Sequence, residues 1–248
     1  MFRRTKIVAT LGPATDDPKI LDKLIEAGVD VVRLNFSHDL AEVHMRRAEM
    51  ARDRAQAHGR QVGVLVDLQG PKIRIGKFAN GPITLQVGET FVIDVEHPAK
   101  EGNQQRVGTT YKSLPNDVGR GSTLLLDDGR IVLWVDQVTA TEVICRVVVG
   151  GELSNNKGIN RQGGGLSAVA LTDKDREDIK TAAAIEADYV AISFPRSAQD
   201  VHEARALLRA AGGKGGIVAK IERAEAVTAI EEIILASDVV MIARGDLG

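Results

Sequence analysis

The chain has 248 residues, a formal net charge of −2 and an aromatic content of 3%. This length allows a large core or two domains, while the weak charge and few aromatic side chains argue against binding to nucleic acid or an anionic membrane. The single cysteine, Cys145, excludes an internal disulfide and suits a reducing compartment, so we expect a cytoplasmic protein. No window approaches the roughly 18 apolar residues of a membrane span, and residues 1–17 hold too short an apolar run for a secretory signal.

Short apolar runs recur in the N-terminal part and in the last third of the chain, and helical patterns lie between them. In the first helical pattern Ile20, Leu21, Leu24 and Ile25 fall on one face, and Thr172 begins a later helix with acidic residues in its first turn. This alternation indicates a parallel sheet covered by helices. We predict strands at residues 6–11, 29–35, 62–68, 189–194, 217–222 and 238–243.

Two α/β architectures fit this alternation, a (β/α)₈ barrel and an open doubly wound sheet. No GxGxxG motif follows a predicted strand, which weakens a dinucleotide-binding interpretation. Between residues 71 and 166 the helical period stops, and segments such as "ITLQVGETFVIDV" alternate with period two, with Asp128-Gly129 as a hairpin signal. We therefore predict an all-β domain at 71–166, inserted between barrel segments 1–70 and 167–248, where it would form a lid.

The stretch "GIVAKIERAEAV" places a lysine and a glutamate in an apolar strand. Residues two apart in a strand point the same way, so Lys220 and Glu222 share a face at its C-terminal end, where barrel enzymes keep their active sites. Asp246 follows the next strand in "ARGDLG", and two carboxylates from adjacent strand ends suit a hard divalent ion such as Mg²⁺. Lys220 beside that ion would stabilise negative charge on a reacting oxygen.

Polar residues also end the other predicted strands. In "VDVVRLNFSH" Arg33 and Asn35 share a face, with Ser37 just beyond, and the planar fork of an arginine suits a phosphate or a carboxylate. Asp67 ends the third strand, and Ser193 lies near the end of the fourth. Each residue alone has a simpler interpretation as a surface charge, an ion pair or a helix cap. Their convergence on the strand ends indicates a site for a charged substrate.

Eight motifs, in order and spacing, resemble those of pyruvate kinase. They are "RRTKIVATLGPAT", "VDVVRLNFSH", "DLQGPKIRIG", "LSNNKGIN", "ALTDKDREDIKTA", "VAISFPRS", "IVAKIERAEAV" and "MIARGDLG". The resemblance covers essentially the whole chain. It implies a (β/α)₈ TIM barrel (A domain), a β-rich lid (B domain) after its third strand, and a C-terminal domain after the barrel. The implied reaction is Mg²⁺-dependent transfer of a phosphoryl group from phosphoenolpyruvate to ADP, giving pyruvate and ATP, with Mn²⁺ as a possible substitute.

The resemblance implies a role for each matching residue. Lys220 corresponds to the catalytic lysine, which stabilises the transferring phosphoryl group and the enolate, and Arg33 holds the phosphate. Glu222 and Asp246 correspond to the Mg²⁺ ligands. The remaining positions are Ala243, Arg244, Gly245 and Asp246 for the substrate carboxylate, Arg74, Lys157 and His38 for the nucleotide, and Asn35, Ser37 and Asp67 for K⁺.

Many members of that family carry "DTKGPE" where this chain has "DLQGPK" at residues 67–72. The change resembles the K⁺-independent branch of the family. It implies that the ammonium group of Lys72 supplies the missing positive charge. We therefore expect that K⁺ is not required.

The sequence ends at Gly248, just after the sixth predicted strand. A family barrel has two further strands and is followed by the C-terminal domain. We therefore expect about six strands of an incomplete barrel, in an N-terminal fragment that is inactive alone. By the resemblance, the intact enzyme is a homotetramer whose main contacts lie in the absent part.

Two other interpretations remain open. An aldolase or mutase of pyruvate enolates on a related barrel would also use Mg²⁺, but it would have no use for an ADP lid or for "GPKIR". A truncated product that binds anions or partners without turnover is the non-enzymatic alternative.

Overall fold

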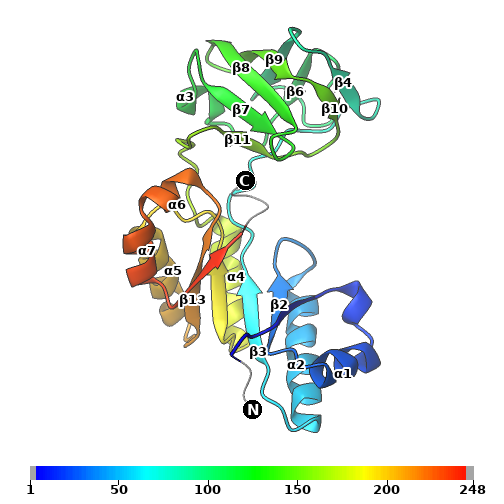
Figure 1. Cartoon of the computed structure of the whole chain (residues 1–248), viewed down its shortest axis with the longest axis vertical. Helices are drawn as coiled ribbons and strands as arrows, with labels where there is room; N and C mark the ends of the chain where they lie inside the picture. The colour runs from blue at the N-terminus through cyan, green and yellow to red at the C-terminus, as the bar shows by residue number, and fades with distance from the viewer. Residues whose placement is uncertain (1–3, 244–248) are drawn as a thin grey trace. The chain divides into compact units, whose positions relative to one another are not determined.

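The computed structural model describes residues 4–243, which form two compact units (Figure 1). One unit is made of residues 4–71 and 170–243, and the other of residues 72–169. The chain therefore leaves the first unit after Pro71 and returns to it at Ala170. Among the described residues, no helix is both long enough and apolar enough to cross a membrane.

The first unit is built on a sheet of six parallel strands, which lie side by side in the order in which the chain makes them. All six predicted strands are present, each within two residues of its predicted ends. In sheet order the strands are β1 (Val8–Leu11), β2 (Val31–Asn35), β3 (Gly63–Asp67), β12 (Tyr189–Ile192), β13 (Gly216–Ile221) and β14 (Val239–Ile242).

Helices connect these strands, and their starts follow from local sequence. Asp17 caps α1 by accepting the Lys19 N–H at 2.9 Å, and Pro18 occupies the first helical position. Thr172 and Asp175 form a capping box at the start of α4, where the sequence predicts a helix start. The helices are α1 (Pro18–Glu26), α2 (Ala41–Ala57), α4 (Asp173–Ala184), α5 (Ala198–Ala210), α6 (Ala224–Thr228) and α7 (Ile230–Ala236).

The strand order decides between the two architectures that the sequence left open. A doubly wound sheet reverses its strand order at a switch point, whereas a barrel adds each strand next to the preceding one. The observed order β1-β2-β3-β12-β13-β14 has no reversal. The predicted α/β fold, six strands of a (β/α)₈ barrel, is confirmed.

The pleat of β13 separates its apolar residues from its charged ones. Ile217 and Ile221 are fully buried on one face, with relative exposures of 0% and 1%. Val218 points to the opposite face, where it packs against Leu65 and Ala191. Lys220, two residues further on, follows the direction of Val218, as the period-two pattern predicts.

The second unit is mainly antiparallel. Its larger sheet has the order β11-β7-β8-β9-β5-β6, and β10 pairs with β4 in a smaller one. The pairing of β5 with β6 is parallel. The elements are β4 (Ile83–Leu85), β5 (Thr90–Asp94), β6 (Arg106–Gly108), α3 (Leu114–Asp117), β7 (Thr123–Leu126), β8 (Ile131–Val138), β9 (Glu142–Val149), β10 (Gly151–Leu153) and β11 (Ile159–Arg161).

The hairpin signal in this unit is confirmed, since Asp128-Gly129 lies in the turn between β7 and β8. Asp127, Asp128 and Gly129 all have positive φ, which Asp and Gly tolerate better than other residues. The helix α3 is a difference from the predicted all-β pattern. It has four residues, too few to produce a helical period in the sequence.

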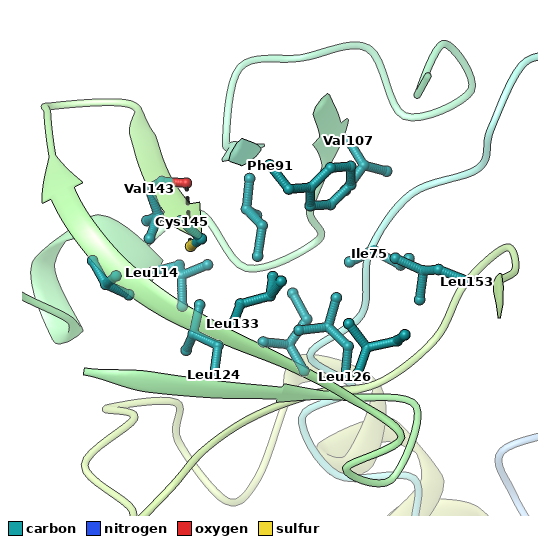
Figure 2. Packing of buried hydrophobic residues seen from close by; sticks show 14 of the residues in the cluster. Ile75, Phe91, Val107, Leu114, Leu124, Leu126, Leu133, Val143, Cys145 and Leu153 are labelled. Atoms are coloured by element: carbon teal, nitrogen blue, oxygen red, sulfur yellow. Dashed lines mark hydrogen bonds between the residues drawn. The ribbon is translucent and has the colours of Figure 1, made fainter. Parts of the chain in front are cut away.

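The core of the second unit includes the only cysteine of the sequence (Figure 2). Phe91, Leu124, Leu133 and Cys145 are each 0% exposed, and they come from four different strands of the larger sheet. The Cys145 thiol donates to the Val143 carbonyl at 3.7 Å. Burial raises the pKa of Cys145 to about 12, so the reactive thiolate is scarce at neutral pH.

Cys145 should therefore report on the opening of this unit. We expect an aromatic disulfide reagent at pH 8 to leave the native thiol unmodified for hours and to titrate one thiol per chain after guanidinium is added. Phe91→Ala should speed native-state labelling, because it removes a buried ring next to the thiol strand. Rapid labelling of the unaltered chain under native conditions would contradict the burial of Cys145.

Candidate active site

Lys220 is at the centre of a polar cluster at the C-terminal ends of the strands. Its Nζ donates to Ser193 Oγ at 2.8 Å and lies 2.8 Å from Glu222 Oε1 and 3.2 Å from Asp67 Oδ1. Asp67 is the last residue of β3, and Ser193 directly follows β12. Three neighbouring strands, β3, β12 and β13, thus bring their ends to one ammonium group.

Arg33 extends the cluster to β2 and β1. Its Nε donates to Asp67 Oδ2 at 2.7 Å, and Nη2 lies 2.5 Å from the same oxygen. Its Nη1 donates to Thr10 Oγ1 at 3.0 Å, and Thr10 is the register partner of Arg33 in the sheet. Asp67 is therefore shared by two cations, one from each side of its strand.

The two carboxylates are buried, whereas the cations are partly open to solvent. Asp67 is 1% exposed and Glu222 is 4% exposed as whole residues. The side chain of Arg33 is 27% exposed and that of Lys220 is 12% exposed. The cluster therefore presents positive groups outward over buried negative ones, which suits the approach of an anion.

Two opposing effects set the pKa of Lys220. Burial is the largest and by itself lowers this pKa, but the nearby charges of Asp67 and Glu222 outweigh it, so the net pKa is raised above 10.5. A raised folded-state pKa stabilises the fold fully below the pKa of an unfolded lysine. This contribution is lost as the pH rises through the folded-state pKa. Lys220 is therefore a cation throughout the neutral range.

Glu222 is held by the backbone as well as by the lysine. Its Oε2 accepts the Phe194 N–H at 3.0 Å, from the turn after β12. A buried carboxylate of this kind has the hard oxygen donors that Mg²⁺ prefers, and Mg²⁺ commonly takes one or two protein carboxylates. The residue fits a Mg²⁺ ligand. Asp246, the predicted second ligand, lies outside the described residues, within which no group of three or more potential metal ligands occurs.

The predicted K⁺ ligands from the β2 end adopt a compact turn. Asn35 is paired in register with Asp67 across β2 and β3, so these two residues are neighbours in the sheet. The Asn35 side-chain oxygen accepts the Ser37 N–H at 3.1 Å. The carbonyl of His38 is 2.8 Å from His44 Nε2, which ties the turn to α2. The cluster around Lys220 therefore has the β2 turn as its neighbour.

The other predicted site residues are distributed over both units. In the second unit the Arg74 guanidinium donates to the Asn156 carbonyl at 2.7 Å, and Lys157 is 2.7 Å from Asp127. Arg74 is thus anchored to the segment between β10 and β11, and Lys157 lies in that segment. Ala243 directly follows β14, and its N–H donates to the Ile221 carbonyl at 3.2 Å. Arg244, Gly245 and Asp246 lie outside the described residues.

Sequence reasoning missed two residues of the cluster, Thr10 and the Phe194 backbone, and it placed Ser193 at a strand end without giving it a specific role. The signal for Thr10 was present, because Thr10 is a polar residue next to the end of the apolar strand β1. The signal for Ser193 was its place directly after β12. A backbone N–H leaves no trace in the sequence, so the contact of Phe194 with Glu222 required the structure.

These features define a class of protein: a barrel-type α/β protein whose strand ends hold paired cations and carboxylates. The sequence pattern of the family "Pyruvate kinase, barrel domain" matches residues 2–248. The chain belongs to the pyruvate kinase family. It is 56% identical to pyruvate kinase II of Salmonella typhimurium, 55% identical to a pyruvate kinase of Haemophilus influenzae and 48% identical to one of Mycobacterium tuberculosis.

Each of these three alignments covers 100% of this chain and 52% of the relative. The chain therefore spans about half the length of the curated relatives it matches. The predicted resemblance to pyruvate kinase is confirmed for this half.

The shared carboxylate should make Asp67 important for stability. We expect Asp67→Asn to lower the free energy of unfolding of the first unit by about 3 kcal/mol, because it leaves two cations beside a neutral group. Urea unfolding followed by the helical signal in far-UV circular dichroism measures this change. Among the described α-helices, all except the four-residue α3 belong to that unit.

Glu177→Gln is the matched control. Glu177 pairs with Lys180 on the same unit, but their side chains are 71% and 65% exposed. Its loss should change the unfolding free energy by less than about 1 kcal/mol. Equal effects of the two substitutions would contradict a structural role for the buried cluster.

Proposed function

We propose that the chain supplies the phosphoryl-transfer site of a cytoplasmic, glycolytic pyruvate kinase, which uses Mg²⁺ to transfer a phosphoryl group from phosphoenolpyruvate to ADP. One observation carries the proposal: Arg33 and Lys220 are held together on the buried carboxylate of Asp67 at the strand ends. The names of the relatives point to the same reaction. The homotetramer remains part of this proposal for the whole enzyme.

Arg33 and Lys220 would have different roles toward the phosphate. The guanidinium group is planar and partly exposed, and it can bind phosphate oxygens through N–H groups beyond those held by Asp67. The Lys220 ammonium group is a compact charge, which stabilises the transferring phosphoryl group and the enolate oxygen left behind. Phosphoryl transfer depends mainly on such positioning and charge stabilisation.

Glu222 would hold the metal, together with Asp246. Bound Mg²⁺ supplies charge neutralisation at the phosphate and enolate oxygens, and Mn²⁺ has the same preference for oxygen ligands. The Glu222 carboxylate is already fixed by the Phe194 N–H at 3.0 Å. It is therefore oriented by the protein before any ion arrives, which reduces the rearrangement that binding requires.

The remaining roles follow the motifs that this chain shares with the family. The backbone after β14, from Ala243 through Arg244 and Gly245 to Asp246, would bind the substrate carboxylate. Arg74, Lys157 and His38 would contact the nucleotide. In support, two cationic side chains lie at the segment between β10 and β11: Arg74 is anchored there by the Asn156 carbonyl, and Lys157, with a side chain 33% exposed, lies within it.

Lys220→Ala should abolish turnover. The assay measures pyruvate from phosphoenolpyruvate and ADP with Mg²⁺, using the 248-residue chain and a chimera in which this chain replaces the matching half of the Salmonella typhimurium relative. In whichever protein is active, we expect Lys220→Ala to lower kcat by at least about 10²-fold, because it removes a preorganised charge from the transition state.

Lys180→Ala is the control for this experiment. Lys180 is an exposed lysine on α4 whose partner, Glu177, is also exposed, and its removal should leave kcat unchanged. Absence of pyruvate formation in both parent proteins, or equal loss in both lysine variants, would overturn the proposed function. Phosphoenolpyruvate-independent cleavage or isomerisation of an enolate substrate would instead identify an aldolase or mutase.

The contacts of Asp67 and Asn35 support the proposal that the reaction does not require K⁺. Asp67 already neutralises two side-chain cations, and the Asn35 oxygen is engaged by the Ser37 N–H. In the proposal the Lys72 ammonium group supplies the charge that K⁺ brings to other family members. The family's usual K⁺ site would then be redundant in this chain.

Lys72→Glu should introduce a dependence on K⁺. With a tetraalkylammonium salt as the only monovalent cation, we expect the unaltered active protein to keep its rate. The variant should lose most of its rate and regain it when K⁺ is added, because the new carboxylate needs a cation nearby. A large loss in the unaltered protein on replacing K⁺ would refute K⁺ independence.

A further inference from the structure

The contacts of the Lys220 ammonium group differ in kind. Glu222 and Asp67 approach it as charged carboxylates, whereas Ser193 accepts its N–H at 2.8 Å as a neutral hydroxyl. On the proposed function, the carboxylate of Glu222 also binds a metal and the ammonium group also meets a phosphate. Substrate and metal would therefore compete with the charged contacts of Lys220. They would not compete with its contact to the Ser193 hydroxyl.

We propose that Ser193 is a positioning residue that holds the Lys220 ammonium group in one orientation before and during the reaction. The expected effect of Ser193 on the reaction rate rests on the proposed function. The contact between Ser193 and Lys220 is independent of it. Ser193 is 2% exposed, so water does not offer the lysine an equivalent acceptor at that point. The assignment adds a residue for which the sequence motifs supplied no role.

The hydroxyl of Ser193 has a fixed direction. It donates its own proton to the Leu68 carbonyl at 2.8 Å. With the proton committed to Leu68, a lone pair of the oxygen faces Nζ of Lys220. Leu68 is itself held, because its N–H donates to the Ala191 carbonyl at 2.9 Å. The hydroxyl is thus an oriented acceptor built on the β3 and β12 ends.

The backbone after Ser193 is fixed as well. Phe194 has φ 57°, in the left-handed region that aromatic residues seldom adopt. In this conformation its N–H donates to Glu222 at 3.0 Å. The strained residue therefore joins two neighbours of the same lysine, since Ser193 contacts Nζ directly and Phe194 holds the carboxylate that also contacts it. Strain of this kind is typical of functional turns.

Gly70 provides the space for this turn. A Cβ at position 70 would lie 2.7 Å from the Ser193 Cβ and 3.1 Å from its carbonyl oxygen, so any side chain there would displace Ser193. Gly70 also has φ +64°, and its N–H donates to the buried Asp175 at 3.0 Å. The position of Ser193 is therefore set from both sides, by hydrogen bonds and by close packing.

Ser193→Ala tests the proposal in the active protein of the pyruvate assay. We expect kcat to fall about tenfold or more, with KM for phosphoenolpyruvate changed less than about twofold, because the lysine keeps its charge but loses its orientation. Ser237→Ala is the matched control. It removes a hydroxyl that donates to the Ile233 carbonyl at 2.8 Å at the C-terminal end of α7, outside the cluster around Lys220, and should leave kcat unchanged.

A second measurement keeps the outcome independent of turnover. The chain is labelled with ¹⁵N-lysine, and the ammonium signal of Lys220 is assigned by its loss in Lys220→Arg. This signal should show slow hydrogen exchange with water. Ser193→Ala should speed the exchange several-fold, while its thermal unfolding midpoint stays close to that of Ser237→Ala. Unchanged exchange in Ser193→Ala would overturn the positioning role. If neither parent forms pyruvate, the proposed function fails, and the exchange result alone decides the role of Ser193.

Discussion

The carboxylate of Asp67 is the point on which the site depends. Arg33 approaches it from β2 and Lys220 from β13, and without a shared anion these two cations would repel each other across the sheet. The position of Asp67 is set by strand register. It lies opposite Asn35 on one side and Ala191 on the other, so a slip of one residue in β3 would turn the carboxylate to the helix side.

The apolar part of the same sheet keeps that register. Leu65, Ala191 and Val218 pack together one pleat below the charged residues, while alternate residues such as Ile217 and Ile221 are buried on the opposite face. The cluster is therefore carried by strands that are fixed by hydrophobic packing along most of their length. Buried ion pairs contribute little net stability themselves. On the proposed function, their presence here is explained by chemistry at the strand ends.

Much of this arrangement was readable from the sequence, and the limits have physical reasons. The six strands were predictable because each is a short apolar run between helical patterns, and the common face of Lys220 and Glu222 follows from the period of a strand. The contact of Lys220 with Asp67 could not be predicted, because it depends on which strands become neighbours in the sheet. In the second unit, the parallel pairing of β5 with β6 was hidden for the same reason, since successive strands with period-two patterns suggest hairpins.

The two kinds of contact around Lys220 have different uses. Charged contacts set the protonation state of the lysine, and they are strong over several ångströms but undemanding in angle. The hydrogen bond that Ser193 accepts from Lys220, and the one that the Phe194 N–H donates to Glu222, are directional and come from neutral groups, so they add little to the field but restrict the geometry. On the proposed function the Lys220 ammonium group also meets a phosphate, so its attraction to Asp67 and Glu222 is shared with that anion and restricts its orientation less. The neutral groups at the end of β12 would then keep the geometry, because an incoming phosphate has no electrostatic reason to displace them.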